Sequence, residues 1–355
     1  MTKSPPSVII YRMQYVILKK VNFDDFITAL AAQEKVVGPV ARGYDNFSFQ
    51  EVKSGKEISI KYIPTILPPK KYFMPQREKL IEFDKSQNKF EAVLEYDKVV
   101  IFGIHTCDLA GIQCLNMVFS DKPKDINYLV RKNKLLIIGL ECNVYCDQYA
   151  SCKVVDNHLP NGGYDLFFTE LPDSFIVHVN TLRGDELIEK TRLFNPAEKI
   201  HLDQLEEVRK KKREIFKDEV KIGHHELSKL FDRAYDSKVW EDLDKRCVAC
   251  GNCTNVCPSC YCFDILDNMN FDFNTGDRSR GWDSCQNEPF AKVATGENFR
   301  KTRGARQRHR YFRKFKYPVE RYSRYFCTGC GRCTRTCMAK ISLKETINAL
   351  VDEQK

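Results

Sequence analysis

The clearest hydrophobic pattern lies in the first half of the chain, where two short apolar runs flank a segment of helical periodicity. The runs are KVVIFGI at 98–104 and LLIIGL at 135–140, and such runs are typical of strands buried on both faces of a sheet. The segment CDLAGIQCLNMVF at 107–119 spaces its apolar residues as a helix does, and KDINYLVRK predicts a second helical piece. Strand, helix and strand predict a βαβ unit with parallel strands.

Apolar patterning, capping residues and prolines predict further elements around this unit. The predicted elements are, in order, an extended segment at 7–22, a helix at 23–33 capped by Asn22, strands at 46–52 and 57–63, a helix starting near Gln76, a β-hairpin at 164–180, and connecting helices at 203–221 and 226–246.

Eight of the 16 cysteines repeat one spacing twice. Cys-x2-Cys-x2-Cys-x3-Cys begins at Cys247 and again at Cys327, and it is typical of bacterial ferredoxins with two [4Fe–4S] clusters, in which the fourth cysteine of each run ligates the other cluster. Zinc is disfavoured because two three-cysteine loops exceed what a tetrahedral site needs, although Met338 stands where proline usually follows. The expected crossed sets are Cys247, Cys250, Cys253 and Cys337 for one cluster, and Cys327, Cys330, Cys333 and Cys257 for the other.

The elements and cysteine runs together predict an α+β multidomain protein. We expect an α/β domain with the parallel βαβ unit at 1–200, a helical connector at 201–245, and a dicluster ferredoxin-like domain at 246–355. About seventy residues separate the two cysteine runs, so a long basic insertion at 258–326 interrupts the ferredoxin-like domain.

Four more cysteines follow the predicted parallel strands. Cys107 comes shortly after the first strand, and Cys142, Cys146 and Cys152 follow the second. Because the carboxyl ends of parallel strands meet at one edge of a sheet, we expect these four sulfurs to converge, which is the number a third [4Fe–4S] cluster needs. A zinc site and unligated thiols remain alternatives. Cys114 is expected to be a small core residue.

Three cysteines lie inside the insertion: Cys260 and Cys262 flank Tyr261, and Cys285 follows in GWDSCQ. They could act in a disulfide or polysulfide reductase, through a persulfide or by disulfide exchange. We favour buried thiols that pack around the clusters, because no lysine or histidine lies near them in sequence to lower their pKa.

The net charge of +9 is concentrated in one segment. Residues 300–324 hold eleven lysines and arginines and one acid. Basic residues interleaved with Tyr and Phe can bind nucleic acid, which would depend on Arg306, Arg308 and Arg310. We favour a structural or partner-binding role, because cationic side chains stabilise anionic clusters. No nucleic acid is therefore expected as a partner.

Several other functions find no support in the sequence. It contains no P-loop, no GxGxxG fingerprint and no GxSxG elbow. It has no apolar run of membrane-spanning length and no convincing signal peptide, so we expect a cytoplasmic protein without a direct membrane span. Its many cysteines would suit the reducing interior of an anaerobic cell.

Several motifs occur in a characteristic order, among them HTCDLAGIQCLNMVF, GLECNVYCDQYASC, CVACGNCTNVCPSCYCFDILD, RGWDSCQNEPFA and CTGCGRCTRTC. Over nearly the whole chain the sequence resembles the beta subunit of cytoplasmic sulfhydrogenases and an iron–sulfur subunit of anaerobic sulfite reductase. The resemblance implies an iron–sulfur electron carrier that makes and breaks no substrate bonds. Its implied partners are a hydrogenase or a sulfite- or sulfur-reducing module and a flavin and NAD(P)-binding subunit. It also implies that Cys107, Cys142, Cys146 and Cys152 suit an extra cluster.

Overall fold

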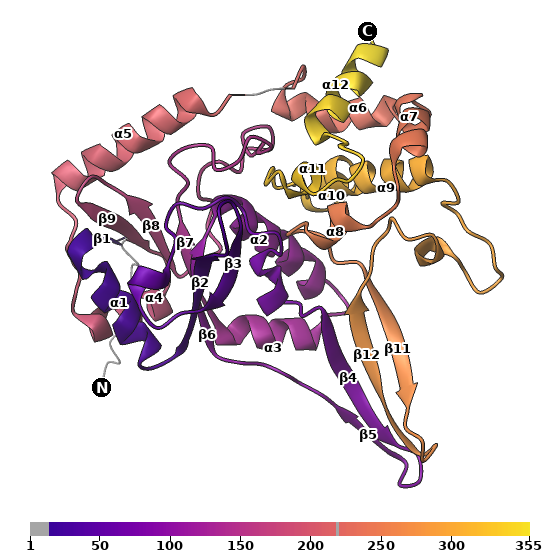
Figure 1. Cartoon of the computed structure of the whole chain (residues 1–355), viewed down its shortest axis with the longest axis horizontal. Helices are drawn as coiled ribbons and strands as arrows, with labels where there is room; N and C mark the ends of the chain where they lie inside the picture. Colours follow the sequence, from indigo (N-terminus) through magenta and orange to yellow (C-terminus); the bar gives the residue numbers. More distant parts are fainter. Residues whose placement is uncertain (1–13, 218–219) are drawn as a thin grey trace, which may run out of the picture.

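The computed structural model describes residues 14–217 and 220–355, and its first half is built on one mixed sheet (Figure 1). The strand order is β10-β1-β9-β8-β7-β6-β2-β3. Strands β2, β6, β7 and β8 are parallel, and antiparallel strands extend both edges. The bounds are β1 Gln14–Lys19, β2 Lys35–Ala41, β3 Phe47–Glu51, β6 Val99–Ile104, β7 Leu135–Leu140, β8 Leu166–Glu170, β9 Ser174–Val179 and β10 Asn195–Pro196.

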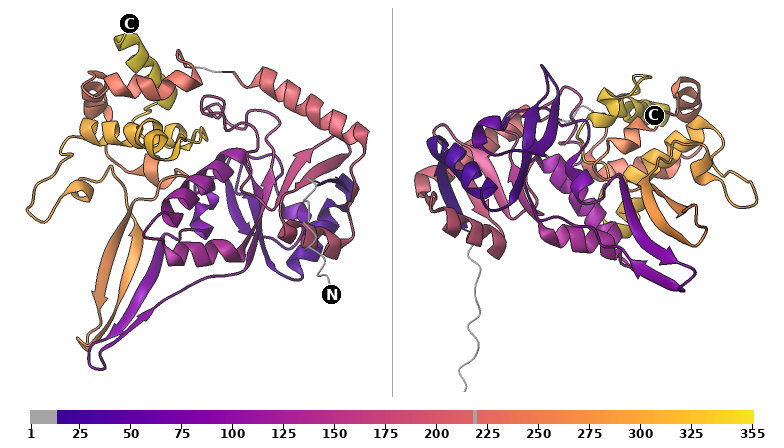
Figure 2. Two further views of the ribbon diagram at one scale, coloured as in Figure 1. Left: turned by 180° about the vertical axis from the view of Figure 1, so that it is seen from behind. Right: turned by 60° about the horizontal axis from the view of Figure 1, so that its bottom comes forward.

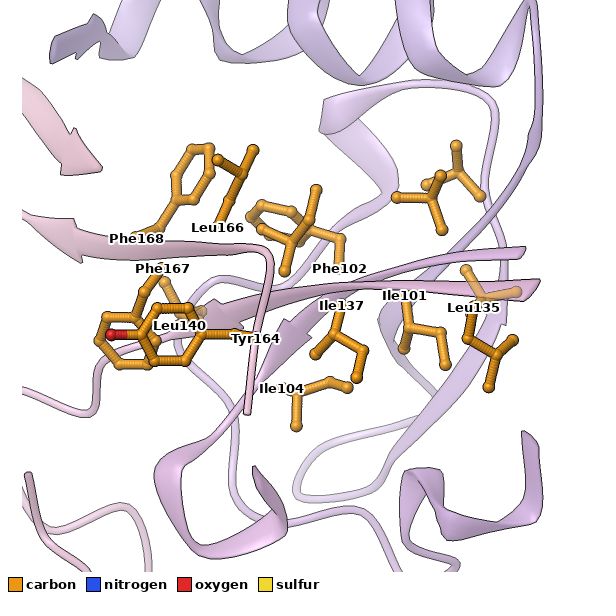
Figure 3. Packing of buried hydrophobic residues seen from close by; sticks show 14 of the residues in the cluster. Ile101, Phe102, Ile104, Leu135, Ile137, Leu140, Tyr164, Leu166, Phe167 and Phe168 are labelled. Atoms are coloured by element: carbon orange, nitrogen blue, oxygen red, sulfur yellow. The ribbon is translucent and has the colours of Figure 1, made fainter. Parts of the chain in front are cut away.

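The βαβ unit predicted from the apolar runs is present, because β6 and β7 pair in parallel and helices connect them. Side chains alternate between the two faces: Phe102 and Phe168 point to one side, and Ile101 and Phe167 to the other (Figure 3). Helix α1 covers the first face, where the Phe26 ring lies 5.7 Å from that of Phe168. The helices on the two faces of the sheet are α1 Phe23–Ala31, α2 Thr106–Ser120, α3 Ile126–Lys134 and α4 Leu182–Thr191.

The sequence predictions hold for most of this half and fail in two places. The hairpin at 164–180 is the pair β8 and β9, and residues 14–19 of the expected extended segment form β1, while 7–13 lie outside the described residues. The strand expected at 57–63 is absent, because the chain there forms a short 3-10 turn and then an irregular segment. The helix expected near Gln76 is wrong, because the following residues form a strand.

That strand belongs to a second sheet, which joins distant parts of the chain. The antiparallel order is β11-β12-β4-β5. Two of these strands come from the insertion between the cysteine runs, and the sheet projects as an arm from the body (Figure 2). Glu78 at its base is fully buried and forms ion pairs with Arg280 (2.6 Å) and Arg131 (2.7 Å). The bounds are β4 Arg77–Asp84, β5 Lys89–Ala92, β11 Phe263–Met269 and β12 Thr275–Trp282.

The last third is mainly helical and has its own core, to which Leu230, Trp240, Phe312 and Ile347 contribute. The helix expected at 226–246 is two helices, α6 and α7, with a turn between them. Within the described ranges, no helix has the length and apolar character needed to cross a membrane. The helix bounds are α5 Lys199–Ile215, α6 Leu227–Arg233, α7 Val239–Arg246, α8 Asn252–Asn255, α9 Arg303–Phe315, α10 Tyr317–Tyr322, α11 Arg332–Arg335 and α12 Leu343–Glu353.

Candidate metal centres

Each ferredoxin-type cysteine run folds into the same local structure, a tight loop followed by the four-residue helix α8 or α11. Gly251 and Gly331 precede these helices with φ of 76° and 75°, and Ala249 and Gly329 adopt φ of 53° and 73° two residues earlier. Left-handed backbone at alternate positions curls the loop. The Ala249 N–H donates a hydrogen bond to the Cys247 sulfur at 3.4 Å. Such backbone hydrogen bonds to sulfur are expected in a loop that surrounds a thiolate-bound cluster.

The eight thiols of the two runs surround two neighbouring cavities. No carboxylate from the described residues lines either one. Thiolates without competing carboxylates are the ligand set that iron–sulfur clusters take. The first cavity is lined by Cys247, Cys250, Cys253, Cys333 and Cys337, and the second by Cys257, Cys327, Cys330 and Cys333. The structure thus brings together both crossed sets, with Cys333 at the wall between them.

Helix α9 supplies the positive charge of these cavities. Arg310 lines both, and Lys314 Nζ lies 3.3 Å from the Cys257 sulfur and 2.7 Å from Ser259 Oγ. Burial alone would lower the pKa of Arg310, but the sulfurs of Cys253 and Cys333 raise it well above its ordinary value.

Part of the basic segment therefore faces the interior. Arg306 and Arg310, two of the three arginines on which nucleic-acid binding would depend, are buried. Arg308, the third, lies over the Tyr235 ring at 3.8 Å and donates to the Tyr235 carbonyl. These contacts favour the structural interpretation of the charge.

Cys107, Cys142, Cys146 and Cys152 lie beyond the carboxyl ends of β6 and β7. Cys107 is in the first turn of α2, and the others belong to the loop after β7. Cys146 interacts with the other three cysteines. A hydrogen bond from Cys142 lowers the pKa of Cys146, and the negative charge of Cys146 contributes to the raised pKa of Cys107 and of Cys152. Burial is the main reason that the pKa of Cys152 rises to about 12. The structure thus brings Cys142 and Cys146 together at the predicted edge of the sheet, and Cys107 and Cys152 are related to them through the charge of Cys146.

His105 also belongs to this group, and sequence reasoning missed it. Its ring nitrogen and the sulfurs of Cys142 and Cys146 lie within 4.8 Å of one another. Its buried Nδ1 has no hydrogen-bond partner among the described atoms, and its ring stacks on Tyr62 at 3.9 Å. His105 directly follows β6, so the strand-end rule that located the cysteines also applies to it. An open pocket lined by His105, Cys142 and Cys146 connects the group with solvent.

The N-terminal group lies directly against the second ferredoxin loop. The Ser151 N–H donates to the Gly329 carbonyl at 2.7 Å, and a Cβ on Gly329 would approach the Cys152 Cα to 2.4 Å. The charge of Cys330 also contributes to the raised pKa of Cys107, after burial and Asp108. Only glycine allows this approach between the two loops.

A buried ion pair fixes the same junction. Arg332 of α11 donates to both carboxylate oxygens of Asp108 at 2.6 and 2.8 Å, and both side chains are inaccessible to solvent. Its Nε also donates to the Thr65 carbonyl. Bidentate geometry of this kind fixes orientation as well as distance, so α11 is held in register with the start of α2.

The three cysteines of the insertion line a third cavity. The sequence offered them no basic neighbour, but the fold brings Lys314 into the lining and places Lys70 Nζ 2.9 Å from the Cys260 carbonyl oxygen. No lysine neighbours these thiols in the sequence, and the fold supplies the cations from distant segments. Cys114 is buried outside these cavities, with its sulfur 3.8 Å from the Tyr325 carbonyl.

Known proteins match both parts of this arrangement. A family described as 4Fe-4S dicluster domain matches residues 246–341. Sulfhydrogenase 2 subunit beta of Pyrococcus furiosus is 36% identical over 333 residues, which cover 93% of this chain and 96% of that protein. The similarity therefore includes the N-terminal sheet as well as the ferredoxin-like part. The chain is an iron–sulfur protein of the electron-transfer type, and it belongs to the sulfhydrogenase beta-subunit family.

Proposed function

We propose that the chain relays electrons within a cytoplasmic oxidoreductase complex, between a hydrogenase or a sulfur- or sulfite-reducing module and a flavin and NAD(P)-binding subunit. Three centres form the relay. The ferredoxin-like part holds one [4Fe–4S] cluster on Cys247, Cys250, Cys253 and Cys337 and another on Cys327, Cys330, Cys333 and Cys257. The N-terminal part holds a third on Cys107, Cys142, Cys146 and Cys152.

The observation that carries the proposal is the contact between the N-terminal cysteine loop and the second ferredoxin loop. Ser151 and Cys152 touch Gly329 through backbone atoms, and Cys333 stands between the two ferredoxin cavities. Three sulfur-lined sites therefore follow one another without an intervening layer of protein. This order supports a continuous path from the sheet edge to the first ferredoxin loop.

Both ends of this path are open to the surface. At one end Cys250 is exposed, and the neighbouring side chains of Val248 and Met338 are 55% and 73% exposed. At the other end a pocket opens beside His105 and Cys146. Exposed apolar side chains beside a redox site suit docking of partner subunits, so we assign one partner to each end.

Bound [4Fe–4S] clusters supply one-electron redox chemistry. The side chains of this chain hold them and set their potentials. Lys314 and Arg310 stabilise negative charge on sulfur, and a backbone N–H hydrogen bond reaches the Cys337 sulfur from Ile341 at 3.3 Å. Burial keeps water from these sulfurs. The protein makes and breaks no substrate bonds in this mechanism.

The proposal is tested by measuring iron, acid-labile sulfide and zinc in the full-length protein, purified without oxygen. We expect Cys146→Ser and Cys330→Ser each to lose about four irons per chain relative to the parent protein. Cys114→Ser is the matched control, because its buried thiol lies outside the cavities, and it should retain all iron. Unchanged iron in Cys146→Ser, or the loss of one zinc alone, would contradict the N-terminal centre.

A further inference from the structure

The arm of the molecule gathers three cysteines that the relay does not use. Cys260 and Cys262 lie just before β11, and Cys285 lies just after β12. Because β11 and β12 pair with each other, the start of β11 and the end of β12 meet at the base of the arm, and the Asp283 N–H donates to the Cys262 carbonyl at 3.0 Å. The Cys262 and Cys285 thiols share a hydrogen bond, and the charge of Cys260 acts on Cys262. Long-range strand pairing thus builds a set of three sulfurs.

The cavity between these sulfurs resembles the two ferredoxin cavities. Like them, it is lined by cysteines together with basic side chains. Arg310 of α9 lines all three, and Lys314 lines this cavity and the second ferredoxin cavity. Within the described ranges no carboxylate lines any of them. One helix therefore presents the same kind of positive surface to three sulfur-lined spaces.

Two buried cations beside this cavity have no carboxylate partner among the described residues. Lys70 is 3% exposed, and its Nζ donates to the Cys260 carbonyl and lies 4.1 Å from the centre of the Trp282 ring. Lys314 is 6% exposed and bonds to Ser259 and Cys257. Neither has a carboxylate oxygen within 4.0 Å in the described part of the chain. Buried cations are costly without counter-charge, so this cavity is suited to an anionic group.

We propose that Cys260, Cys262 and Cys285 are the ligands of an additional [4Fe–4S] cluster, distinct from the three centres of the relay. Soft thiolates favour an iron–sulfur group, and the negative charge of the bound group would balance Lys70 and Lys314. His309 lines the same cavity and is placed to provide the one ligand that is not cysteine. The site adjoins the second ferredoxin centre, because the Cys260 thiol shares a hydrogen bond with that of Cys257. The additional cluster would therefore form a side branch that leaves the relay at the second ferredoxin centre.

The proposal is tested by the metal content of Cys262→Ser and Cys285→Ser in the full-length protein, purified without oxygen. We expect each variant to lose about four irons and four sulfides per chain, with the other clusters kept. Cys114→Ser serves again as the control for a buried thiol outside the cavities. Iron content equal to that of the parent protein would overturn the proposal, and so would the loss of one zinc with no iron.

A second measurement tests the proposed cluster even if Cys262→Ser or Cys285→Ser fails to fold. Far-UV circular dichroism would reveal such a failure. The Cys146→Ser protein keeps the three cysteines of the arm intact. With two ferredoxin clusters and the proposed one, it should contain about twelve irons. About eight irons would overturn the proposal. This result is separate from the test of the N-terminal centre, which depends on the difference between Cys146→Ser and the parent protein.

Discussion

Two regions of this molecule contain buried cations whose partners differ. Where the N-terminal sheet meets the rest of the chain, two buried cations face carboxylates: Arg332 pairs with Asp108, and Lys212 pairs with Glu141 at 3.1 Å. Along α9, Arg310 and Lys314 face cysteine sulfur and have no carboxylate within 4.0 Å in the described residues. The first region balances its charge with the polypeptide alone. In the second, the described anionic groups that face Arg310 and Lys314 are cysteine sulfurs.

The carboxylate pairs stabilise the fold with side chains alone, whereas the charge balance along α9 depends on bound cofactors. A buried ion pair is destabilised when one partner is removed, because the remaining charge is left without compensation. In the carboxylate region that partner is a side chain. In the α9 region it is thiolate with its bound iron. Loss of iron should therefore affect the two regions very differently.

The largest effect is expected on removal of iron by anaerobic chelation. Amides of α9 and α12 should exchange roughly a thousandfold faster, because leaving buried cations uncompensated costs about 4 kcal/mol. Amides of β6 and β7 should keep their protection, since the fully buried strands need no metal. Hydrogen exchange with mass spectrometry checks both. Equal protection of α9 with and without iron would refute the contrast between the regions.

An effect of similar size, but confined to one ion pair, is expected from Asp108→Asn in the carboxylate region. The substitution keeps the size of the side chain but leaves Arg332 buried without its counter-charge, so stability should fall by about 3–5 kcal/mol. Anaerobic denaturant unfolding measures this loss. The control Arg278→Ala breaks an exposed pair with Asp267 and should cost about 1 kcal/mol or less. Equal costs for the two variants would show that the buried pair has no special role.

The smallest effect is expected from Lys314→Met, which removes one positive charge beside Cys257. A charge-assisted hydrogen bond contributes about 1.5–3 kcal/mol, so the second ferredoxin centre should become harder to reduce by roughly 60–130 mV. A redox titration followed by electron paramagnetic resonance measures the shift. Lys316→Met is the control, because Lys316 pairs with Asp232 and Glu320 at the surface. A similar shift in both variants would mean that the sulfur contact is unimportant.

The sequence predicts the ferredoxin sites well because their geometry is local. The x2 and x3 spacings fix which sulfurs share a loop, and the structure places the crossed sets around two cavities. The N-terminal cysteines were located by a topological rule, since β6 and β7 are adjacent and parallel. The same rule covered His105, but a single histidine at a strand end gives no spacing signal.

The features that sequence reasoning missed depend on long-range pairing. REKLIEF at 77–83 was expected to be helical, and it is a strand because β12, about two hundred residues later, pairs with it. The same pairing anchors β12, and with it Cys285, near Lys70. No local pattern links these segments. The cations of α9 were visible as charge, but their inward direction follows only from packing.

The central claim is that the N-terminal centre and the ferredoxin centres form one continuous path. Electron paramagnetic resonance of the fully reduced protein tests it most directly, because neighbouring paramagnetic centres broaden and split each other's signals. We expect an interaction spectrum in the parent protein, which simplifies in Cys146→Ser as the N-terminal centre is lost. An identical spectrum for the parent protein and Cys146→Ser would contradict the account, because no reduced N-terminal centre would then interact with the ferredoxin centres.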